Sequence, residues 1–391
     1  MTLLEKRNIA CEALGINPEN KIILSLDGGG IRGILTLQLL KKIEEIAGIP
    51  CYELFDMVAG TSTGGIIAGL IAEGKTAKDI DALYKKLVTK VFKKRRWGNR
   101  YLNPPEYDKT NYRKALKNHL GNASLKDVCE KTHLDIMITS KDVVAGEETF
   151  FTCFKNDANE FVGTYKDVLL RAVLEATMSA PTYFTPLERF VDGGTTTYNN
   201  PTLSAIMEAV HYGGKEKYDL SKLTVFSFGT GTTVEFIKPE ETSNPKGLDA
   251  MFWLNFVMRE SSQDASDMQN YLIRSGIIPG LDFRRFQISL DANAMSKLPD
   301  RRIEDIDDVE ADWLRELTDE ELKGIELDDV NKFPLMNVIG EAMLDLIMEE
   351  NKFTKDLVNN KNRDLLVSTI GNPSRIKEQM SDPEWLDGFK S

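Results

Sequence analysis

Short apolar runs alternate with segments of helical periodicity from residue 21 onward. Six of these runs have the length and the β-branched or aromatic content of strands, namely residues 21–26, 54–60, 134–140, 148–154, 187–192 and 223–229. After the second run, apolar positions recur at the spacing of an amphipathic helix, at Ile80, Leu83, Leu87, Val88, Val91 and Phe92. Strands that alternate with helices are typical of a sheet covered on both faces. The order of elements therefore predicts a three-layer α/β/α sandwich with a mainly parallel central sheet.

A second helical pattern lies late in the chain. After Pro334, apolar residues repeat at helical spacing, at Leu335, Val338, Ile339, Ala342, Met343, Leu346 and Ile347. The stretch before it, residues 301–330, contains thirteen Asp and Glu against four Lys and Arg, and this shift in composition favours a boundary. We expect an N-terminal extension over residues 1–20, an α/β domain over 21–300, and an acidic, mainly helical C-terminal region over 301–391 that packs on the α/β core.

Composition excludes several classes of protein. With 391 residues, 41% of them hydrophobic and 28% charged, the chain has the composition of a soluble globular protein. Charged residues at positions 5–7 interrupt the apolar core that a signal peptide needs, so we expect a cytoplasmic protein. A net charge of −12 argues against a nucleic-acid partner. The four cysteines and three histidines show no metal-ligand spacing, so we expect reduced thiols and no metal site.

The stretch SLDGGGIRGIL, residues 25–35, places glycines in the spacing G-x-G-x-x-G after a predicted strand. This spacing is found in loops that bind dinucleotide phosphates. That interpretation fails here, because a Rossmann site needs an acidic residue at the end of the second strand, and this strand ends in Gly-Thr-Ser. Asp27, at the mouth of the loop, would also repel a pyrophosphate, and the loop lacks the G-K-[ST] ending of a P-loop. We therefore expect a different role for these glycines.

A second glycine-rich turn, GTSTGG at residues 60–65, matches the nucleophile-elbow pattern G-x-S-x-G. In that pattern a serine lies on a sharp turn between a strand and a helix, with its hydroxyl exposed above the sheet. The flanks agree, because a predicted strand precedes the turn and the run TGGIIAGLIAEG, which is apolar on all faces, is typical of a buried helix. Ser62 is therefore the candidate nucleophile.

The two glycine-rich loops are interpreted best together. If the strands before them are neighbours in one parallel sheet, both loops lie at the same carboxyl edge, where the sites of α/β proteins are found. The N–H groups of Gly28, Gly29, Gly30 and Ile31 would then face an oxygen on the carbonyl group that Ser62 attacks. Because an oxyanion hole needs N–H donors and close approach of the backbone, we expect this loop to form one.

A serine nucleophile needs a base. His119, His133 and His211 lie outside the glycine-rich strand-end loops, and we expect them to be core or surface residues. Asp192, in RFVDGGTTTYNNP, ends an apolar run and precedes two glycines. Burial at a strand end raises the pKa of a carboxylate and improves proton acceptance, although DGG also begins ordinary β-turns. With Ser62 as its partner, Asp192 is the candidate base.

The blocks DGGGIRG, GTSTGG and DGG occur in the order typical of the patatin-like phospholipase family. The segments EATMSAPTYFTP at residues 175–186 and FSFGTGT at residues 226–232 also resemble that family. The likeness covers roughly residues 21–350.

This resemblance implies a lipid acyl hydrolase of the phospholipase A or lysophospholipase type, with Ser62 as nucleophile and Asp192 as base. The implied oxyanion loop comprises Gly28, Gly29, Gly30, Ile31 and Arg32. Arg32 would support the loop, face anionic lipid or form a structural ion pair. The resemblance implies neither cofactor nor metal. It leaves open acyl transfer or thioester cleavage by the same dyad, and an effector that degrades membranes when a small molecule such as a cyclic nucleotide activates it.

A basic stretch, VFKKRRWGNRY at residues 91–101, follows the predicted amphipathic helix. Its cations and aromatic residues are Lys93, Lys94, Arg95, Arg96, Trp97, Arg100 and Tyr101. Cations beside an interfacial aromatic residue suit an anionic membrane, whereas a charge run is also typical of a solvated face. Because the implied substrate is a membrane phospholipid or another acyl lipid, we expect peripheral contact with the inner membrane surface. A homo-oligomer stays open.

Overall fold

The computed structural model describes residues 1–92, 105–233, 250–303, 306, 309–350, 352–354, 357–358, 378 and 380–384. The strands are β1 (Lys21–Leu26), β2 (Met57–Gly60), β3 (Asp135–Asp142), β4 (Glu147–Lys155), β5 (Phe161–Val162), β6 (Phe190–Asp192), β7 (Leu223–Phe228), β8 (Asp282–Gln287) and β9 (Leu357–Val358). The helices are α1 (Leu3–Ala13), α2 (Gly33–Ala47), α3 (Cys51–Leu54), α4 (Thr63–Ala72), α5 (Ala77–Val91), α6 (Thr110–Leu120), α7 (Leu125–Thr132), α8 (Leu170–Thr177), α9 (Thr202–Glu208), α11 (Ala250–Arg274), α12 (Ala292–Met295), α13 (Asp319–Lys323) and α14 (Phe333–Glu349).

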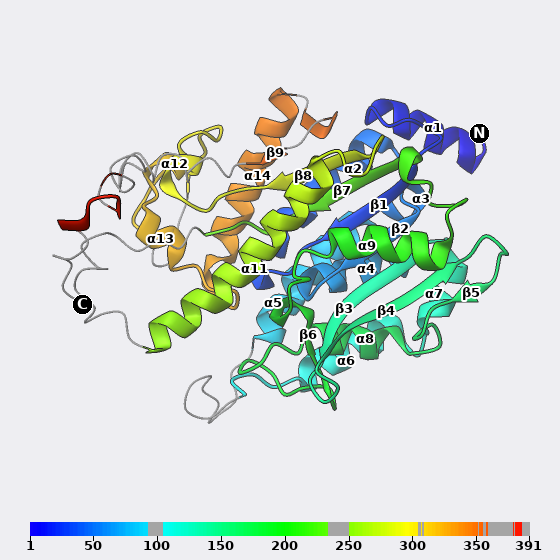
Figure 1. Ribbon diagram of the computed structural model, residues 1–391, viewed down its shortest axis with the longest axis horizontal. Helices are drawn as coiled ribbons and strands as arrows, with labels where there is room; N and C mark the ends of the chain where they lie inside the picture. The colour runs from blue at the N-terminus through cyan, green and yellow to red at the C-terminus, as the bar shows by residue number, and fades with distance from the viewer. Residues whose placement is uncertain are drawn as a thin grey trace.

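The strands of the described residues form one central sheet (Figure 1). Their order is β5-β4-β3-β2-β1-β7-β8-β9, and β6 pairs with β3 beside this path. Neighbours from β3 through β2, β1, β7 and β8 to β9 are parallel, whereas β4, β5 and β6 are antiparallel to their partners. The predicted mainly parallel sheet is confirmed.

Helices cover both faces of this sheet. Successive side chains of a strand point to opposite faces, and in β1 both faces carry apolar, buried side chains. In β1, Ile22, Leu24 and Leu26 belong to a hydrophobic cluster with residues of α2, α4, α8 and α14. Ile23 belongs to a second cluster with residues of α9 and α11. Figure 1 shows α9 and α11 on the viewer's side of the sheet. The layers therefore follow the predicted α/β/α order.

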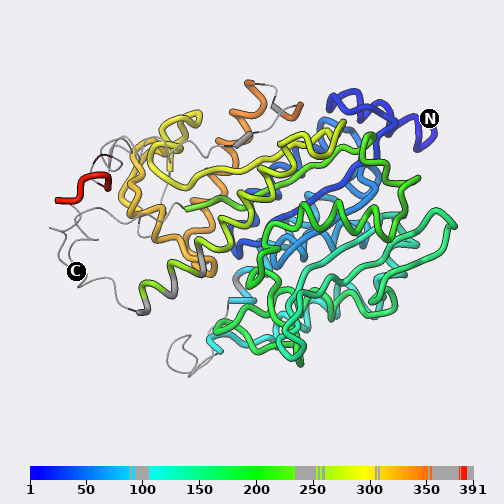
Figure 2. Tube along the Cα trace, viewed as in Figure 1, coloured from blue at the N-terminus to red at the C-terminus, as the bar shows by residue number. Residues whose placement is uncertain are grey.

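Helices α5 and α14 correspond to the two predicted amphipathic helices. Thr76 caps α5 by accepting the N–H of Asp79, and Ile80 in its first turn is fully buried. Helix α14 packs against α2, where Nε2 of Gln38 donates to Oδ1 of Asn337 at 2.7 Å. In Figure 2 the colours of these two helices, blue for α2 and orange for α14, show that they come from opposite ends of the sequence. The late helix is therefore part of the main body of the protein.

Two predicted strands are shorter than expected. Helix α3 precedes β2 and occupies the start of the run 54–60. The run 187–192 contains a tight turn, in which the N–H of Leu187 donates to the carbonyl of Phe190 at 2.9 Å. Glu188 in this turn has a positive φ of 55°. Only β6 remains extended, and it pairs with β3.

The hydrophobic core extends across both expected boundaries, after residue 20 and after residue 300. Arg7 of α1 forms an ion pair with Asp56 before β2, with 2.6 Å between Nη2 and Oδ2. Cys11 of α1 and Ile339 of α14 lie in the same hydrophobic cluster as Ile34 of α2. Strand β9 then adds to the sheet beside β8. Residues before position 21 and after position 300 therefore contribute to the core that supports the site.

Candidate active site

The two glycine-rich loops meet at the carboxyl edge of the sheet. Strands β1 and β2 are parallel neighbours, with Leu26 opposite Gly60 where both strands end. We call residues 27–32, which follow β1, the glycine loop. This loop lies against the turn after β2, since a Cβ placed on Gly28 would be 3.2 Å from the Cβ of Ser62. The two strands are therefore neighbours, which is the condition on which the joint interpretation of the two loops depended.

Ser62 occupies the turn between β2 and α4 in a strained backbone conformation. Its φ is 53° and its ψ is −123°, a combination that residues with a side chain rarely adopt. The N–H of Ser62 donates to Oγ1 of Thr177 at 2.8 Å. Helix α4 approaches β1 so closely that a Cβ on Gly64 would lie 2.3 Å from the carbonyl oxygen of Leu26. This contact explains the second glycine of G-x-S-x-G, and the geometry is that of a nucleophile elbow.

Asp192 ends β6, where it lies opposite Ser140 of β3. Oγ of Ser62 donates to its Oδ2 at 2.6 Å, although 130 residues separate the two in sequence. The other carboxylate oxygen, Oδ1, accepts the N–H of Gly194 at 2.7 Å. The N–H of Asp192 donates to the carbonyl of Ser179 at 3.1 Å. Strand pairing and these hydrogen bonds hold the carboxylate against the serine hydroxyl.

Burial governs the protonation of this carboxylate. Asp192 is 5% exposed. Desolvation raises its pKa to about 6, while hydrogen bonds from Ser62 and Gly194 oppose the rise. No lysine or arginine of the described ranges forms an ion pair with it. Asp192 is therefore mostly ionised at neutral pH, and it accepts a proton more readily than an exposed carboxylate does.

Two of the expected oxyanion donors in the glycine loop are already engaged. The N–H of Gly28 donates to the carbonyl of Asn199 at 3.2 Å. The N–H of Ile31 donates to the carbonyl of Leu327 at 2.8 Å. Because each N–H has its proton directed at a protein carbonyl, the structure does not bear out the expectation that Gly28 and Ile31 donate to a substrate oxygen.

The N–H groups of Gly29 and Gly30 have no acceptor in the part of the chain that the structure describes. A trans peptide holds its N–H antiparallel to the preceding carbonyl, so the carbonyl contacts of the loop orient these two groups. The carbonyl of Gly28 accepts a hydrogen bond from Oγ1 of Thr230 at 2.7 Å. The carbonyl of Gly29 accepts one from the N–H of Arg32 at 3.1 Å. Arg32 thus contributes to the loop through its backbone, and both peptide planes are fixed.

Gly30 is the point at which the loop is clamped. Its φ is +55°, and a Cβ there would lie 2.0 Å from the carbonyl oxygen of Leu327. Its own carbonyl accepts Oγ1 of Thr63 at 3.0 Å and also the hydroxyl of Tyr84. The glycine loop is therefore held between α4, α5 and the segment around Leu327.

A buried ion pair lies beneath the glycine loop. Nη1 and Nη2 of Arg285, on β8, donate to the two carboxylate oxygens of Asp27 at 2.9 and 2.5 Å, and Nη1 also donates to Oγ of Ser227 at 2.8 Å. Asp27 is 4% exposed and Arg285 is 1% exposed. Burial raises the pKa of Asp27, and Arg285 opposes that rise. Asp27 therefore anchors the loop from below instead of facing its mouth, which corrects its expected position.

The three histidines are exposed and lie on other elements. His119 is in the last turn of α6, and His133 follows the end of α7. His211 lies in the π-helical turn after α9. The hydroxyl of Ser62 donates to Asp192 instead, so the expectation that the histidines are ordinary residues agrees with their positions.

The remaining expectations concern the cysteines, metal ligands, membrane-spanning helices and the basic cluster. All four cysteines are buried and unbridged. In the described ranges, no three His, Cys, Asp or Glu side chains gather as metal ligands do. None of the helices described here is both long and apolar enough to cross a lipid bilayer. The basic cluster at residues 93–100 lies outside the described residues.

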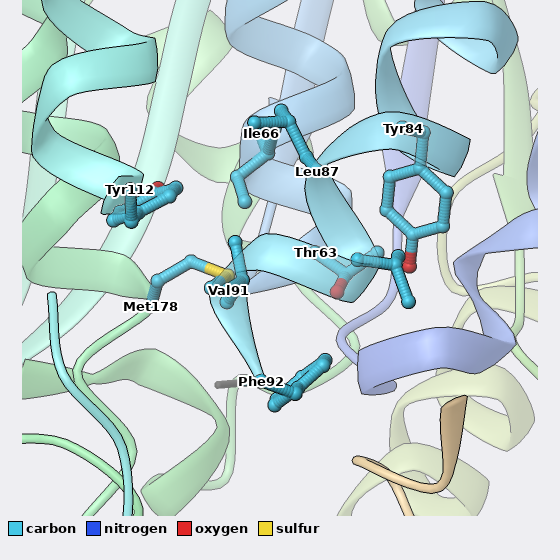
Figure 3. A pocket seen from close by; sticks show the side chains of 9 residues that line it. Thr63, Ile66, Tyr84, Leu87, Val91, Phe92, Tyr112 and Met178 are labelled. Carbon is cyan, nitrogen blue, oxygen red and sulfur yellow. The ribbon is translucent and has the colours of Figure 1, made fainter. Parts of the chain in front are cut away.

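An apolar pocket lies beside the turn that carries Ser62 (Figure 3). It has about 320 Å³ of empty volume, its open part included. It is lined by Thr63, Ile66, Tyr84, Leu87, Val88, Val91, Phe92, Tyr112 and Met178. Sequence reasoning assigned the α5 residues of this wall only to a generic amphipathic face.

The fold and the site together define an α/β/α protein of the nucleophile-elbow type, with a Ser-Asp pair and an adjoining glycine loop. The family model described as Patatin-like phospholipase matches residues 24–206, which make up just under half of the chain. The resemblance inferred from the three sequence blocks is thereby confirmed.

Individual relatives agree with this resemblance. The chain is 33% identical over 254 residues to an 85/88 kDa calcium-independent phospholipase A2 of Rattus norvegicus, covering 57% of this chain and 29% of the relative. It is 26% identical to Patatin-17 of Solanum cardiophyllum, covering 70% of this chain and 76% of the relative. It is 31% identical to a cGAMP-activated phospholipase of Escherichia coli (strain TW11681), covering 54% of this chain and 62% of the relative. The match thus spans less than a third of the rat protein.

Proposed function

We propose that the protein is a lipid acyl hydrolase of the phospholipase A or lysophospholipase type, with Ser62 as nucleophile and Asp192 as base. The observation that carries this proposal is the 2.6 Å hydrogen bond from Oγ of Ser62 to a buried carboxylate with a raised pKa. The relatives from rat and E. coli are named as phospholipases, which supports a lipid ester as the substrate.

In the first half of the reaction, Oγ of Ser62 attacks the carbonyl carbon of the ester while its proton passes to Oδ2 of Asp192. The carbonyl oxygen becomes an oxyanion, which the N–H groups of Gly29 and Gly30 stabilise. The bond between carbon and the alcohol oxygen then breaks. Asp192 returns the proton to this leaving oxygen, and the acyl group stays on Ser62.

Water completes the cycle. Asp192 takes a proton from water as the water oxygen attacks the acyl-enzyme, and a second oxyanion forms in the glycine loop. When this intermediate collapses, the bond to Oγ breaks and Oγ of Ser62 recovers a proton from Asp192. The fatty acid leaves, and each step uses only groups of the chain and water.

The test measures free fatty acid and lysophospholipid by mass spectrometry after incubation with phospholipid vesicles. We expect Ser62→Ala to reduce release to background. Ser275→Ala serves as the matched control, because Ser275 is exposed after α11 and its hydroxyl forms hydrogen bonds only with the nearby backbone of Leu272 and Ile277 among the described residues. A fluorophosphonate probe should label the parent and the control but not Ser62→Ala. Equal release by Ser62→Ala and its control would refute the proposal.

Regulation by a small molecule is a second part of the test, since the E. coli relative is named as cGAMP-activated. The vesicle assay is run with and without cGAMP. Release that rises with cGAMP and depends on Ser62 would identify a regulated hydrolase, whereas equal release would identify one that cGAMP does not regulate.

We further propose that the basic residues 93–96 with Trp97 dock the protein on anionic membranes. Replacing all four cations with Gln should weaken binding to anionic vesicles, with a loss that fades as salt is added, because each basic residue contributes about 1 kcal/mol near such a surface. Hydrolysis of p-nitrophenyl butyrate should stay unchanged. Equal losses on vesicles and on the small ester would assign these residues to the fold instead.

A further inference from the structure

The last residues of α8 and those directly after it contact both members of the Ser-Asp pair. Oγ1 of Thr177, which ends α8, accepts the N–H of Ser62 at 2.8 Å. Two residues further on, the carbonyl of Ser179 accepts the N–H of Asp192 at 3.1 Å. Thr177 and Ser179 are both fully buried. We call residues 175–179 the α8 end, and the placement of nucleophile and base relative to each other depends on how firmly this segment is held.

A buried cation contacts the α8 end from the side of α6, which lies beside α8 (Figure 1). Lys109 directly precedes α6, and its side chain is only 5% exposed. Its Nζ donates to Oγ of Ser179 at 2.6 Å and to Oε1 of Glu175 at 3.3 Å. Oγ of Ser179 in turn donates to the carbonyl of Glu175 at 2.6 Å. Lys109 is therefore bound to the first and the last residue of the α8 end.

Glu175 supplies the opposite charge. Burial opposes its ionised form, but Arg113 and Lys109 hold the pKa of Glu175 below its ordinary value. Burial lowers the pKa of Lys109, and the charge of Glu175 opposes this effect. Burying an ammonium group is costly even when it is paired, so its presence here needs an explanation beyond the ion pair itself.

The attachment of α6 to α8 does not provide that explanation, because other residues already supply it. Arg113, one turn into α6, donates to both carboxylate oxygens of Glu175 at 2.6 to 2.9 Å. The hydroxyl of Tyr112 donates to the carbonyl of Leu174 at 3.0 Å. The contact that distinguishes Lys109 from these residues is its hydrogen bond to Ser179, the residue that binds the backbone of Asp192.

We propose that Lys109 is a positioning residue, which acts through the hydroxyl of Ser179 to hold the backbone of Asp192 against Ser62. The inference rests on the proposed acyl hydrolase function and adds to it a residue that touches neither the substrate nor the reacting atoms. With its hydroxyl bound on both sides, Ser179 keeps its carbonyl directed at the N–H of Asp192. Because a displacement of about 1 Å at a reacting group can cost about 10²-fold in rate, loss of the ammonium group should lower kcat.

The experiment compares the parent with Lys109→Met on p-nitrophenyl butyrate, and also measures how fast a fluorophosphonate probe labels Ser62. We expect kcat and the labelling rate to fall about tenfold or more at equal concentrations of folded protein, with KM nearly unchanged. A role in stability alone would lower the melting temperature and leave both rates as they are. Rates equal to those of the parent would therefore overturn the proposal.

Lys217→Met is the matched control. Lys217 also pairs with a buried carboxylate, since its Nζ lies 2.6 Å from Oδ2 of Asp135. Asp135 begins β3, however, and thus lies at the amino edge of the sheet, away from Ser62. The control should lose stability and keep its kcat. An equal loss of kcat in Lys217→Met and Lys109→Met would overturn the proposal, because the effect would then follow from losing any buried lysine.

A double-mutant cycle tests the route through Ser179. Ser179→Ala removes only a hydroxyl, so it also serves as the milder variant if Lys109→Met yields little folded protein. Because Lys109 acts through this hydroxyl, the double variant should have a kcat close to that of the slower single variant. Losses that multiply in the double variant would show that the two residues act independently, and the proposed route would be wrong.

Hydrogen exchange separates this inference from the proposed function, because it needs no activity. Exchange measured by mass spectrometry on peptides that contain Asp192 should be faster in Lys109→Met than in the parent or in Lys217→Met. Faster exchange without any Ser62-dependent hydrolysis would refute the hydrolase and support the hold of Lys109 on Asp192. Hydrolysis that depends on Ser62, with kcat and exchange unchanged in Lys109→Met, would overturn the role of Lys109 and leave the hydrolase.

Discussion

Two buried aspartates, Asp27 and Asp192, lie at the carboxyl edge of the same sheet, and they have different hydrogen-bond partners. Asp27 follows β1 and Asp192 ends β6, and both are at most 5% exposed. Burial raises the pKa of each. Asp27 receives both terminal nitrogens of a buried arginine, whereas Asp192 receives the hydroxyl of Ser62 and one backbone N–H.

The difference shows how one side chain can serve as a fixed anchor or as a proton acceptor. A guanidinium that donates to both oxygens favours the ionised form of a carboxylate and fixes its orientation, which suits Asp27 beneath the glycine loop. Without a cation, Asp192 keeps a pKa of about 6 and can gain and lose a proton near neutral pH. Arg285 therefore balances the charge of Asp27, which supports the loop. Asp192, beside Ser62, has no such counter-ion in the described part of the chain.

The largest expected effect comes from replacing Asp192. Asp192→Asn preserves shape but cannot accept the proton of Ser62, so kcat/KM should fall by about 10²- to 10⁴-fold. The same variant should be more stable than the parent at neutral pH. A rise in pKa from 3.8 to about 6 corresponds to roughly 3 kcal/mol of unfavourable burial of the ionised form.

The sign of this stability effect follows from proton binding. Because the pKa of Asp192 is higher in the folded than in the unfolded protein, this group makes the parent less stable as pH rises from about 4 through 6. Melting temperatures measured between pH 4 and 8 should show an advantage for Asp192→Asn that grows up to pH 6 and then levels. An advantage that shrinks with rising pH would contradict the assigned pKa.

The second prediction concerns the ion pair of Asp27 with Arg285. Arg285→Met leaves Asp27 buried without its cation and should lower the free energy of unfolding by about 3–5 kcal/mol at pH 7. The loss should be smaller at acidic pH, where Asp27 is protonated. Urea unfolding measures both values. The double variant Asp27→Asn with Arg285→Met should recover most of the stability, and an additive loss in the double variant would show that the two residues are not coupled.

The third prediction concerns the pH profile of the parent. Activity needs ionised Asp192, so kcat/KM on a soluble ester should fall about tenfold per pH unit below pH 6. An inflection near pH 4, where an exposed carboxylate titrates, would indicate that Asp192 is not desolvated during catalysis.

The smallest expected effect lies in the backbone of Ser62. Both Ser62→Ala and Ser62→Gly remove the nucleophile, but only glycine adopts a φ of 53° with a ψ of −123° without strain. We expect Ser62→Gly to be more stable than Ser62→Ala by about 1 kcal/mol, after the larger entropy of glycine in the unfolded chain is included. Chemical denaturation of the two variants checks this difference, and equal stabilities would mean that the turn stores no strain.

Much of the site could be predicted from the sequence because it depends on local signals. G-x-S-x-G encodes a turn between a strand and a helix, and DGG marks the end of a short strand, so Ser62 and Asp192 were identifiable. The pairing of β1 with β2 was a condition of interpreting the two loops together, and the structure supplies it. The roles of these residues in catalysis stay a prediction.

The parts that could not be predicted depend on distant contacts. The segment DFRRFQ contains two arginines and does not have the pattern of a buried strand, yet Arg285 is 1% exposed because Asp27, 258 residues away, balances its charge. Likewise, the N–H of Ile31 is engaged by the carbonyl of Leu327. Backbone carbonyls carry no side-chain signal, so the sequence could not show which N–H groups of the glycine loop remain available.

The order of strands determines how long a segment of the chain must be to form the complete sheet. The family match ends at residue 206, but β7, which begins at Leu223, pairs with β1 along its whole length. A fragment cut at the end of the match would leave an apolar strand edge open to pairing with other chains, which promotes aggregation. It would also lack Arg285 and the segment around Leu327. A segment that is to fold in another protein must therefore be longer than the segment that the family model matches.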